Sequence, residues 1–493
     1  MEKRNSSDDR QLHTIPPVFD KNSKILILGS FPSVKSRQQQ FFYGHPQNRF
    51  WKVLAGVFAE DTPQTVKEKK TFLLSHGIAV WDVIGSCTIT GSSDASIRDV
   101  VPNDLSVILD QTSVTTIYIN GTKAYELFCR YTKPLLQSRY QSPIANAVLL
   151  PSTSPANAAW RVNDLMNAWL RIRMGLLRRP LNKAYYPFGA FAEDQFGKKL
   201  YRLSLDGGFT CPNRDGTKGT GGCIFCDGSG SGRFAGTLSA RDTIRKELPG
   251  IREQLICQKE LIAPKLPKTK QVGYIAYFQA FTGTYDTPER LRSLYLEAIA
   301  DPEVKILDIA TRPDCLSDEV MDVLCEINEK KPVWIELGLQ TIHKKTAELI
   351  RRGYMTKEYD DALTRLKKAG IPQVITHLIL GLPGEDAAMM KKSLIHAVEK
   401  GSAGIKLSML HVLAGTELEK IYQAGKMDVF TLEEYKALLG ELLAVLPPDV
   451  AVHRLTGDGD KRTLIAPLWS ADKKHVLNEL KNMYSTEERS VIR

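Results

Sequence analysis

The sequence lacks any long apolar run, and this absence excludes the usual classes of membrane protein. No stretch of the 493 residues reaches the roughly 18–20 consecutive apolar residues that a membrane-spanning helix needs. Residues 1–13, MEKRNSSDDRQLH, also lack the apolar core of an export signal. We therefore expect a cytoplasmic protein that makes no contact with a membrane.

Cysteine is scarce and unevenly placed. Three of the eight cysteines fall between Cys211 and Cys226, and the other five are scattered. This distribution is typical of a reducing compartment in which clustered thiols bind metal. Only Cys87 and Cys129 lie in the first 173 residues, which is too few for a four-thiolate cluster there. Internal repeats and low-complexity tracts are also absent.

Acidic residues are outnumbered by basic ones. The formal net charge is +10, and residues 1–173 hold 20 Lys and Arg against 14 Asp and Glu. Such an excess favours a polyanionic partner, although it also fits a merely basic soluble protein. The hydrophobic fraction of 43% and the charged fraction of 25% are those of globular proteins. The length predicts two or more domains.

The first part of the chain alternates between strand and helix patterns. Buried parallel strands are predicted at 24–30, 77–82, 116–120 and 147–150. Helical patterns fall at 47–58, 64–75, 121–134 and 155–172. The alternation predicts an α/β domain over residues 23–173, with a four-stranded parallel sheet covered by helices on both faces. Residues 1–22 are polar and are predicted to be flexible.

Polar motifs follow these strands at the carboxyl ends, where parallel sheets bind ligands. They are GSFPS, FYGHPQNRFW, NG and PSTSPAN, and they offer the side chains Tyr43, Asn48, Asn120, Ser152 and Ser154. Ser/Pro turns can grip phosphates through free N–H groups, and Tyr43 can stack on an extruded base. Plainer interpretations stay open: Asn48 as a helix cap, Tyr43 as core packing and the serines as ordinary loop residues.

Together these motifs resemble the uracil-DNA glycosylase superfamily, and within it the hypoxanthine (deoxyinosine) DNA glycosylases. The resemblance covers residues 20–172. It implies that DNA is the partner, that Asn48 is catalytic and that Tyr43 stacks on the base. It also implies that the loop with Ser152 and Ser154 lies near the scissile nucleotide, and that Asn120 reads the base edge.

The first loop departs from the wider superfamily. Many members place Asp or Asn there to activate water, whereas this chain has GSFPS. The departure favours the hypoxanthine branch over efficient uracil excision. Because the half also shows no obvious lysine nucleophile, the resemblance implies simple hydrolysis without cleavage of the DNA strand.

A basic segment separates this part from a second series of strands and helices. We place a linker at 174–183 and a second domain at 184–493. Strands are predicted at 199–205, 272–279, 304–311, 333–340, 374–382 and 404–412. Helices are predicted near 240–261, 288–300, 317–330, 343–369, 386–400 and 417–446. Six β/α units predict a (β/α)6 partial barrel, short of the eight units of a closed barrel.

The loop CPNRDGTKGTGGCIFC, residues 211–226, carries the strongest chemical signal. Its thiols Cys211, Cys223 and Cys226 can hold three irons of a 4Fe–4S cluster and leave the fourth iron open. Zinc normally takes four ligands, and no nearby Cys or His completes such a set. A structural zinc site and inert loop thiols remain the alternatives. Cys257 and Cys325 fall in helical patterns and are interpreted as packing residues, and Cys315 follows a strand.

With the preceding LDGGFT, this loop resembles the cluster motif of radical S-adenosylmethionine (SAM) enzymes of the YhcC/YtqA type. The resemblance continues to the C-terminus, over some 300 residues. It implies a 4Fe–4S cluster on Cys211, Cys223 and Cys226 and SAM chelated at the open iron. It also implies an electron donor such as flavodoxin or ferredoxin, and a 5′-deoxyadenosyl radical that abstracts a substrate hydrogen.

Strand ends of the second part offer further groups. The residues assigned to the cofactor are Phe225, Gln279, Glu336, Gln340 and Gly381. The GGE motif that many radical SAM enzymes use for the methionyl amine is absent from the second strand end. For Glu336 the alternative is a buried ion pair with a neighbouring arginine. His453 and Arg454, in a segment that matches the same family, are interpreted as substrate contacts.

The two resemblances predict a bifunctional enzyme of nucleic-acid bases. One half would release hypoxanthine from DNA, and the other would modify tRNA by radical chemistry. The tRNA prediction is an association, because the YhcC/YtqA type is related to radical enzymes that modify tRNA. Two alternatives remain: a first half that only binds nucleic acid, and a radical half that acts on a small metabolite or a protein.

Overall fold

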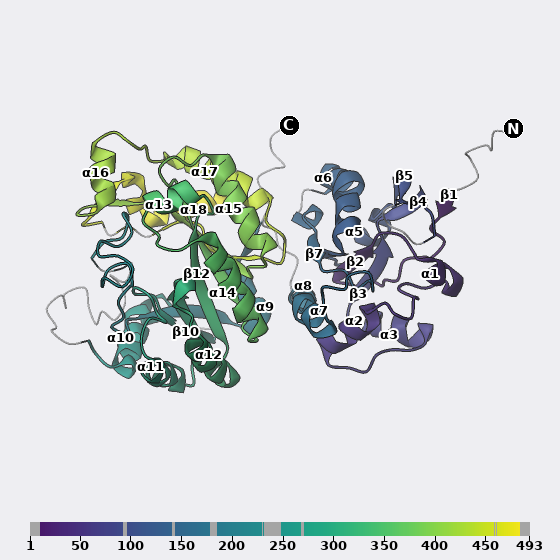
Figure 1. The fold of residues 1–493 in the computed structure, drawn as a ribbon, viewed down its shortest axis with the longest axis horizontal. Helices are drawn as coiled ribbons and strands as arrows, with labels where there is room; N and C mark the ends of the chain where they lie inside the picture. The colour runs from purple at the N-terminus through teal and green to yellow at the C-terminus, as the bar shows by residue number, and fades with distance from the viewer. Residues whose placement is uncertain are drawn as a thin grey trace. The chain divides into compact units, whose positions relative to one another are not determined.

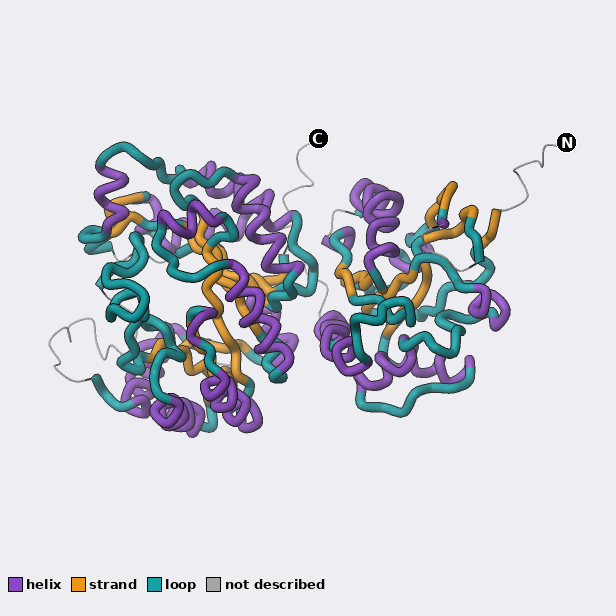
Figure 2. Tube along the Cα trace, in the orientation of Figure 1, coloured by secondary structure: helices purple, strands orange, loops and turns teal. Residues whose placement is uncertain are grey.

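The computed structural model describes residues 10–91, 96–140, 143–177, 185–228, 230, 248–267, 271–457, 459 and 461–483. The chain divides into two compact units, residues 1–184 with 447–449 and residues 185–446 with 450–493. Each unit has strands in its interior and helices around them (Figures 1 and 2). Within the described residues, no helix combines the length and the apolar character needed to cross a bilayer.

The first unit contains the predicted four-stranded parallel sheet. Its strands are β2 (Ile25–Gly29), β3 (Ile78–Asp82), β6 (Thr116–Asn120) and β7 (Val148–Leu150), in the order β3-β2-β6-β7. All three pairings are parallel, which confirms the expected α/β class. The strands form because their apolar residues are buried: every residue of β2 is buried, and in β7 Val148 and Leu150 are buried while Leu149 is exposed.

Helices cover both faces of this sheet, because successive strand residues point to opposite sides. Ile25 and Ile27 of β2 share a core with Phe50 and Trp169, whereas Leu26 belongs to the core on the other face. The helices are α1 (Val34–Gln39), α2 (Phe50–Phe58), α3 (Val66–Ser75), α4 (Ser106–Leu109), α5 (Thr122–Leu127), α6 (Lys133–Arg139), α7 (Val162–Trp169) and α8 (Arg171–Leu177).

A second, antiparallel sheet was not foreseen. It consists of β1 (Arg10–Leu12), β4 (Ile84–Thr88) and β5 (Arg98–Pro102), in the order β1-β4-β5. The structure thereby differs from the expectation of a flexible segment up to residue 22, because β1 pairs with β4 and both Ile15 and Val18 are buried. Two apolar anchors in a polar stretch are too weak a periodic signal to reveal this. Residues 1–9 lie outside the described part.

The second unit contains one parallel sheet of eight strands, in the order β8-β16-β14-β13-β12-β11-β10-β9. The six long strands match the predicted ones: β9 (Lys199–Leu205), β10 (Val272–Phe278), β11 (Val304–Thr311), β12 (Val333–Gln340), β13 (Val374–Leu380) and β14 (Gly404–Met409). The short strands β16 (Ala451–Arg454) and β8 (Tyr186–Pro187) extend one edge. The curled partial barrel is therefore confirmed, with two additional edge strands.

The helices predicted at 343–369 and 417–446 are each split in two. The observed helices otherwise follow the long strands as predicted. They are α9 (Phe188–Phe196), α10 (Ile251–Ile262), α11 (Pro288–Ala300), α12 (Asp318–Lys330), α13 (Lys344–Leu349), α14 (Thr356–Lys368), α15 (Ala387–Glu399), α16 (Glu417–Gln423), α17 (Leu432–Ala444) and α18 (Lys473–Met483). The single helix expected at 343–369 is split, because Arg351 and Gly353 adopt positive φ. A small antiparallel pair, β15 (Val412–Leu413) with β17 (Leu464–Ala466), lies beyond β14. Most of the proposed linker lies outside the described residues.

Candidate active sites

Asn48 and Asn120 meet at one threonine in the first unit. Asn120 ends β6, and its Nδ2 donates to Thr153 Oγ1 at 2.9 Å. The Thr153 hydroxyl lies 3.0 Å from Asn48 Oδ1, to which the Phe50 N–H also donates at 2.9 Å. Thr153 is fully buried. The structure thus brings together two side chains that the sequence picked separately. Asn48 precedes Arg49, the N-cap residue of α2, and accepts from the N–H of the first helical residue, Phe50.

Tyr43 lies beside the same group. Its ring stacks on Phe50 with the centroids 3.7 Å apart, and its φ of 52° is unusual for an aromatic residue. The hydroxyl is buried, and among the described residues it makes no hydrogen bond of good geometry, although the Asn120 side chain is close enough to affect its pKa. Burial, followed by the negative charge of Asp82, raises the pKa of this phenol, so it stays protonated. Tyr43 therefore contributes both core packing and an unused donor.

The loop with Ser152 and Ser154 is held in place by Arg49. The Arg49 guanidinium donates to the carbonyl oxygens of Thr153 at 3.3 Å, Ser154 at 2.5 Å and Asn157 at 3.0 Å, and also to that of Trp160. Within the loop, Ser152 Oγ accepts from the Ser154 N–H at 3.2 Å, and Ser154 Oγ from the Ala156 N–H at 3.3 Å. These hydrogen bonds make the loop, which follows β7, a rigid turn held beside the N-terminal end of α2.

Asp82 is a carboxylate that the sequence analysis missed. It ends β3, and its Oδ2 lies 2.9 Å from His13 Nε2 in a buried pair. A Cβ on Gly29 would lie 2.3 Å from Asp82 Oδ1 and 3.2 Å from the Tyr43 hydroxyl, so glycine is needed for this close approach. Asp82 could have been predicted as a site residue, because it stands at the carboxyl end of a predicted strand. His13 gave none, because it lies in the segment expected to be flexible.

In the second unit, Cys211, Cys223 and Cys226 line one cavity of about 910 Å³ at the carboxyl ends of the strands. Burial raises the pKa of Cys223 to about 11, and the Cys226 charge adds to this effect. Among the described residues, no three His, Cys, Asp or Glu side chains are arranged to hold a single ion. The thiols of a cluster bind separate irons, so they need only face one space.

These thiols fit an iron–sulfur cluster by their surroundings. Asn213 Nδ2 lies 3.6 Å from Cys223 Sγ, and Arg214 donates to the Cys226 carbonyl at 2.9 Å. Arg312 is close enough for its positive charge to favour the Cys223 thiolate. Such donors and cations are what a cluster of thiolates requires around it. Cys315 is not among the residues that line the cavity.

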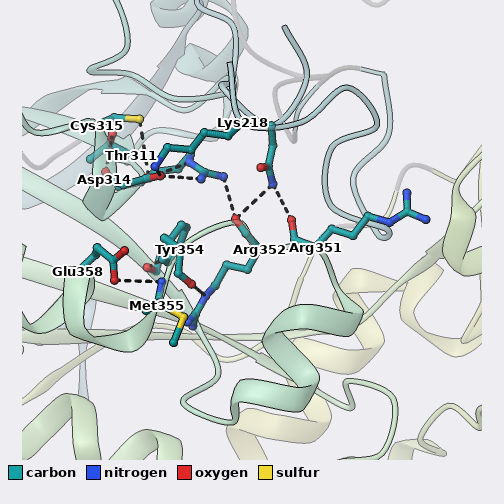
Figure 3. Close-up of polar contacts among 12 residues, drawn as sticks. Lys218, Thr311, Asp314, Cys315, Arg351, Arg352, Tyr354, Met355 and Glu358 are labelled. Carbon is teal, nitrogen blue, oxygen red and sulfur yellow. Dashed lines mark hydrogen bonds and ion pairs between the residues drawn. The ribbon is translucent and has the colours of Figure 1, made fainter. Parts of the chain in front are cut away.

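Residues 351–354 connect the cysteine loop to β12. Figure 3 shows Arg351, Arg352 and Tyr354 of this segment. Asn213 Nδ2 donates to the carbonyl oxygens of Arg351 at 2.6 Å and Arg352 at 3.2 Å. The Arg352 guanidinium donates to Leu339 O at 2.7 Å, and Tyr354 OH to Gly338 O at 3.0 Å. The interruption of the helix predicted at 343–369 therefore builds the support of the cluster loop.

Four of the five side chains assigned to the cofactor line the cavity. They are Phe225, Gln279, Glu336 and Gln340. Gln279 Oε1 accepts from Ser204 at 3.3 Å, and Gln340 Oε1 from Tyr354 at 2.8 Å. Gly381 is not among the lining residues; a Cβ there would lie 3.0 Å from the Phe430 ring, so its close approach is to the protein itself.

Glu336 is already surrounded by donors. Its carboxylate accepts from Tyr277 OH at 2.5 Å and His377 Nε2 at 2.8 Å, and it pairs with Lys406 and Arg202. Burial alone would raise the pKa of Glu336, but the charges of Lys406, His377 and Arg202 hold it well below its usual range. The structure has the buried ion pair that was the alternative for this residue. Glu336 also lines the cavity, so its contact with the cofactor remains a prediction.

His453 and Arg454 are neighbours on β16 and differ in environment. Arg454 lines the cavity, whereas His453 is not among the lining residues. His453 lies 3.0 Å from Arg202 and packs on Phe188 with the ring centroids 5.0 Å apart. Burial holds the pKa of His453 well below its usual value. The substrate contacts expected for His453 and Arg454 remain predictions.

Different protein families match the first and the second unit of the chain. The family model described as the uracil DNA glycosylase superfamily matches residues 16–173. The model of the radical SAM superfamily matches residues 216–396, and that of the Radical_SAM C-terminal domain matches residues 402–485.

Three curated relatives span the two halves. The uncharacterized protein YtqA of Bacillus subtilis is 41% identical over 299 residues, which cover 60% of this chain and 88% of that protein. The hypoxanthine DNA glycosylase of Methanosarcina acetivorans is 36% identical over 151 residues, 30% of this chain and 89% of that protein. The tRNA uridine(34) acetyltransferase of Methanocaldococcus jannaschii is 28% identical over 155 residues, 31% of this chain and 28% of that protein.

Proposed function

Because the chain belongs to the uracil-DNA glycosylase superfamily in its first part and to the radical SAM superfamily in its second, we propose that it is a bifunctional enzyme of nucleic-acid bases. The first half hydrolyses the bond between hypoxanthine and deoxyribose in DNA. The second half modifies tRNA by radical chemistry that starts from SAM.

The polar group of Asn48, Thr153 and Asn120 beside Tyr43 is the observation that supports the glycosylase half. In the hydrolysis, the C1′–N9 bond breaks, and its electron pair leaves with the purine. Water adds its oxygen to C1′, and the purine takes up a proton. Donors such as Asn48 stabilise the charge on the leaving base, and the Asp82 carboxylate, held by His13, can orient the water.

Hypoxanthine is the preferred base in this proposal because the first loop lacks the acid or amide used on uracil, and because a relative at 36% identity bears that activity in its name. The test is the release of free base by the full chain from duplexes with one deoxyinosine or one deoxyuridine, without SAM or reductant. Strong uracil release without hypoxanthine release would contradict the choice of base.

The cavity lined by three cysteines supports the radical half. Cys211, Cys223 and Cys226 would hold a 4Fe–4S cluster, and Phe225, Gln279 and Gln340 would contact SAM. When bound, these groups supply a carbon radical that removes a hydrogen atom from the substrate. The chain's own part is to orient the substrate and to accept an electron from a protein donor such as a flavodoxin or ferredoxin.

The cavity rim supports an anionic substrate. Arg454, Lys461, Arg462 and Lys473 line it, and among them Lys461, Arg462 and Lys473 are exposed. Exposed lysine and arginine side chains are the usual contacts of nucleic-acid phosphates. Bases in single-stranded tRNA loops can be turned out of their stack, so they could reach the cavity.

Loss of the second half should change the tRNA of its host. If residues 184–493 are deleted, one modified nucleoside should disappear and its precursor should accumulate, as measured by mass spectrometry of digested tRNA. The wild-type segment should restore the nucleoside, and the same segment with Cys223→Ala should not. An unchanged nucleoside profile, with the protein shown to be expressed in the parent, would exclude tRNA under those conditions and favour a metabolite or a protein substrate.

A further inference from the structure

The orientation of the Asn48 amide is fixed by a backbone group. The Phe50 N–H lies 2.9 Å from the Asn48 side chain. A backbone N–H can only donate, so the atom that faces it must be the oxygen Oδ1. The amide orientation of Asn48 therefore follows from the chain itself and is independent of how oxygen and nitrogen were assigned.

The Thr153 hydroxyl is fixed in the same way. The Thr153 N–H lies 3.0 Å from the Asn120 side chain, which must therefore present Oδ1 to it. Asn120 then presents Nδ2 to Thr153 Oγ1 at 2.9 Å, so this oxygen accepts one hydrogen bond from Asn120. The hydroxyl hydrogen is left for Asn48 Oδ1 at 3.0 Å. Two backbone N–H groups thus set the direction of every hydrogen bond from Asn120 to Asn48.

This arrangement leaves Asn48 with donors only. Its Oδ1 has two lone pairs, and the Phe50 N–H and the Thr153 hydroxyl occupy both. Neither Nδ2 hydrogen has a partner among the described residues. Asn48 therefore has no free acceptor with which to orient a water molecule by its hydrogens.

We propose that Asn48 acts on the bound nucleotide as a hydrogen-bond donor through Nδ2, and that Thr153 is the positioning residue that occupies the second lone pair of Oδ1 and holds the amide in place. The acceptor is a ring nitrogen or the carbonyl oxygen of the leaving base, where the electron pair of the broken bond collects. The inference rests on the proposed glycosylase function. The acceptor that orients the water is then another residue. We assign this role to Asp82, which ends β3, the strand that pairs with β2.

Asn48→Asp distinguishes a donor role from an acceptor role, because aspartate keeps both contacts in which Asn48 accepts a hydrogen bond and loses both Nδ2 donors. Full-length Asn48→Asp should release hypoxanthine from a deoxyinosine duplex at least about 100-fold more slowly than wild type under single-turnover conditions. Its affinity for the duplex can fall modestly through the added negative charge. A rate within threefold of wild type would overturn the proposal, because a carboxylate would then serve as well as the amide. Asn22→Asp, the same change at an exposed site before β2, should cleave at the wild-type rate.

Thr153 is tested by removing its hydroxyl without changing its shape. Thr153→Val should lower the single-turnover rate about tenfold while the dissociation constant for the duplex stays within twofold, because the Phe50 N–H alone then holds the amide of Asn48 in place. Thr153→Ser keeps the hydroxyl and should restore most of the rate. Equal rates for Thr153→Val and Thr153→Ser would show that the hydroxyl does not position Asn48.

Thermal melting tests the hydrogen bonds whether or not any base is released. Asn48→Asp should melt within about 2 °C of wild type, because the Phe50 N–H and the Thr153 hydroxyl keep their acceptor. Asn48→Ala leaves both without one and should lower the Tm of the first unit by about 4 °C. If Asn48→Asp melted as low as Asn48→Ala, the assigned direction would be wrong. If wild type released no base but the melting order held, the proposed function would fail and the hydrogen-bond assignment would stand.

Discussion

Replacing Cys223 by alanine should abolish the iron–sulfur cluster of the reconstituted protein and, with it, all cleavage of SAM. The expected wild-type content is about one 4Fe–4S cluster per chain, with the irons held by Cys211, Cys223 and Cys226. Two remaining thiolates leave two irons without protein ligands, so the cluster is lost rather than weakened. Iron and sulfide analysis and the electron paramagnetic resonance signal of the reduced protein measure this directly.

Cys257 and Cys315 provide matched controls. Cys257 lies on α10, and Cys315 follows β11 without lining the cavity. Cys257→Ala and Cys315→Ala should each retain the iron content and the spectrum of the wild type. If either variant lost the cluster as completely as Cys223→Ala, the assignment of the three ligands would be incorrect.

Asn48→Ala should stop the release of hypoxanthine while the protein still binds DNA. The alanine removes the Nδ2 donor that we place on the leaving base, and one such donor accounts for about 100- to 1,000-fold in rate. Most of the affinity for DNA comes from contacts to the backbone phosphates, which this substitution does not touch. Base release is followed by chromatography of the free base, and binding by fluorescence anisotropy of a labelled duplex.

The salt dependence of binding serves as the control for Asn48→Ala. Wild type and variant should lose affinity in parallel as the salt concentration rises, because phosphate contacts release the same counterions in both. A variant that still released hypoxanthine at more than about one tenth of the wild-type rate would remove Asn48 from the reaction. A variant that lost DNA binding altogether would show that Asn48 acts in binding instead.

Most strands of the two parallel sheets could be predicted from the sequence because they are short apolar runs that the fold buries. In β9 the buried residues alternate in part with half-buried ones. All ten predicted strands are present at the expected places, from β2 to β14. The antiparallel sheet of the first unit could not be predicted in this way. Its strand β1 is three residues long, with its middle residue half-buried, and its pairing with β4 bridges more than 70 residues of sequence. Local periodicity carries no information on such a pairing.

The sites follow the same division. The cluster cysteines and Asn48 lie in compact local motifs, and the structure places each at the carboxyl end of its sheet. Thr153 could not be predicted as a site residue, because its role depends on Asn48 and Asn120, which lie 105 and 33 residues away in the sequence. For Glu336, the neighbours Lys406 and Tyr277 come from strands that no motif links to it. The partners of a buried charge are set by the register of the sheet, which the sequence pattern does not specify.

Product analysis of the reconstituted full chain tests the central claim, that one chain holds two enzymes of nucleic-acid bases. The anaerobic protein is given SAM, dithionite and bulk tRNA from the host that lacks residues 184–493, together with a deoxyinosine duplex. We expect 5′-deoxyadenosine, a mass change in one tRNA nucleoside and free hypoxanthine from the duplex. Formation of 5′-deoxyadenosine with every tRNA nucleoside unchanged and the deoxyinosine intact would contradict the account.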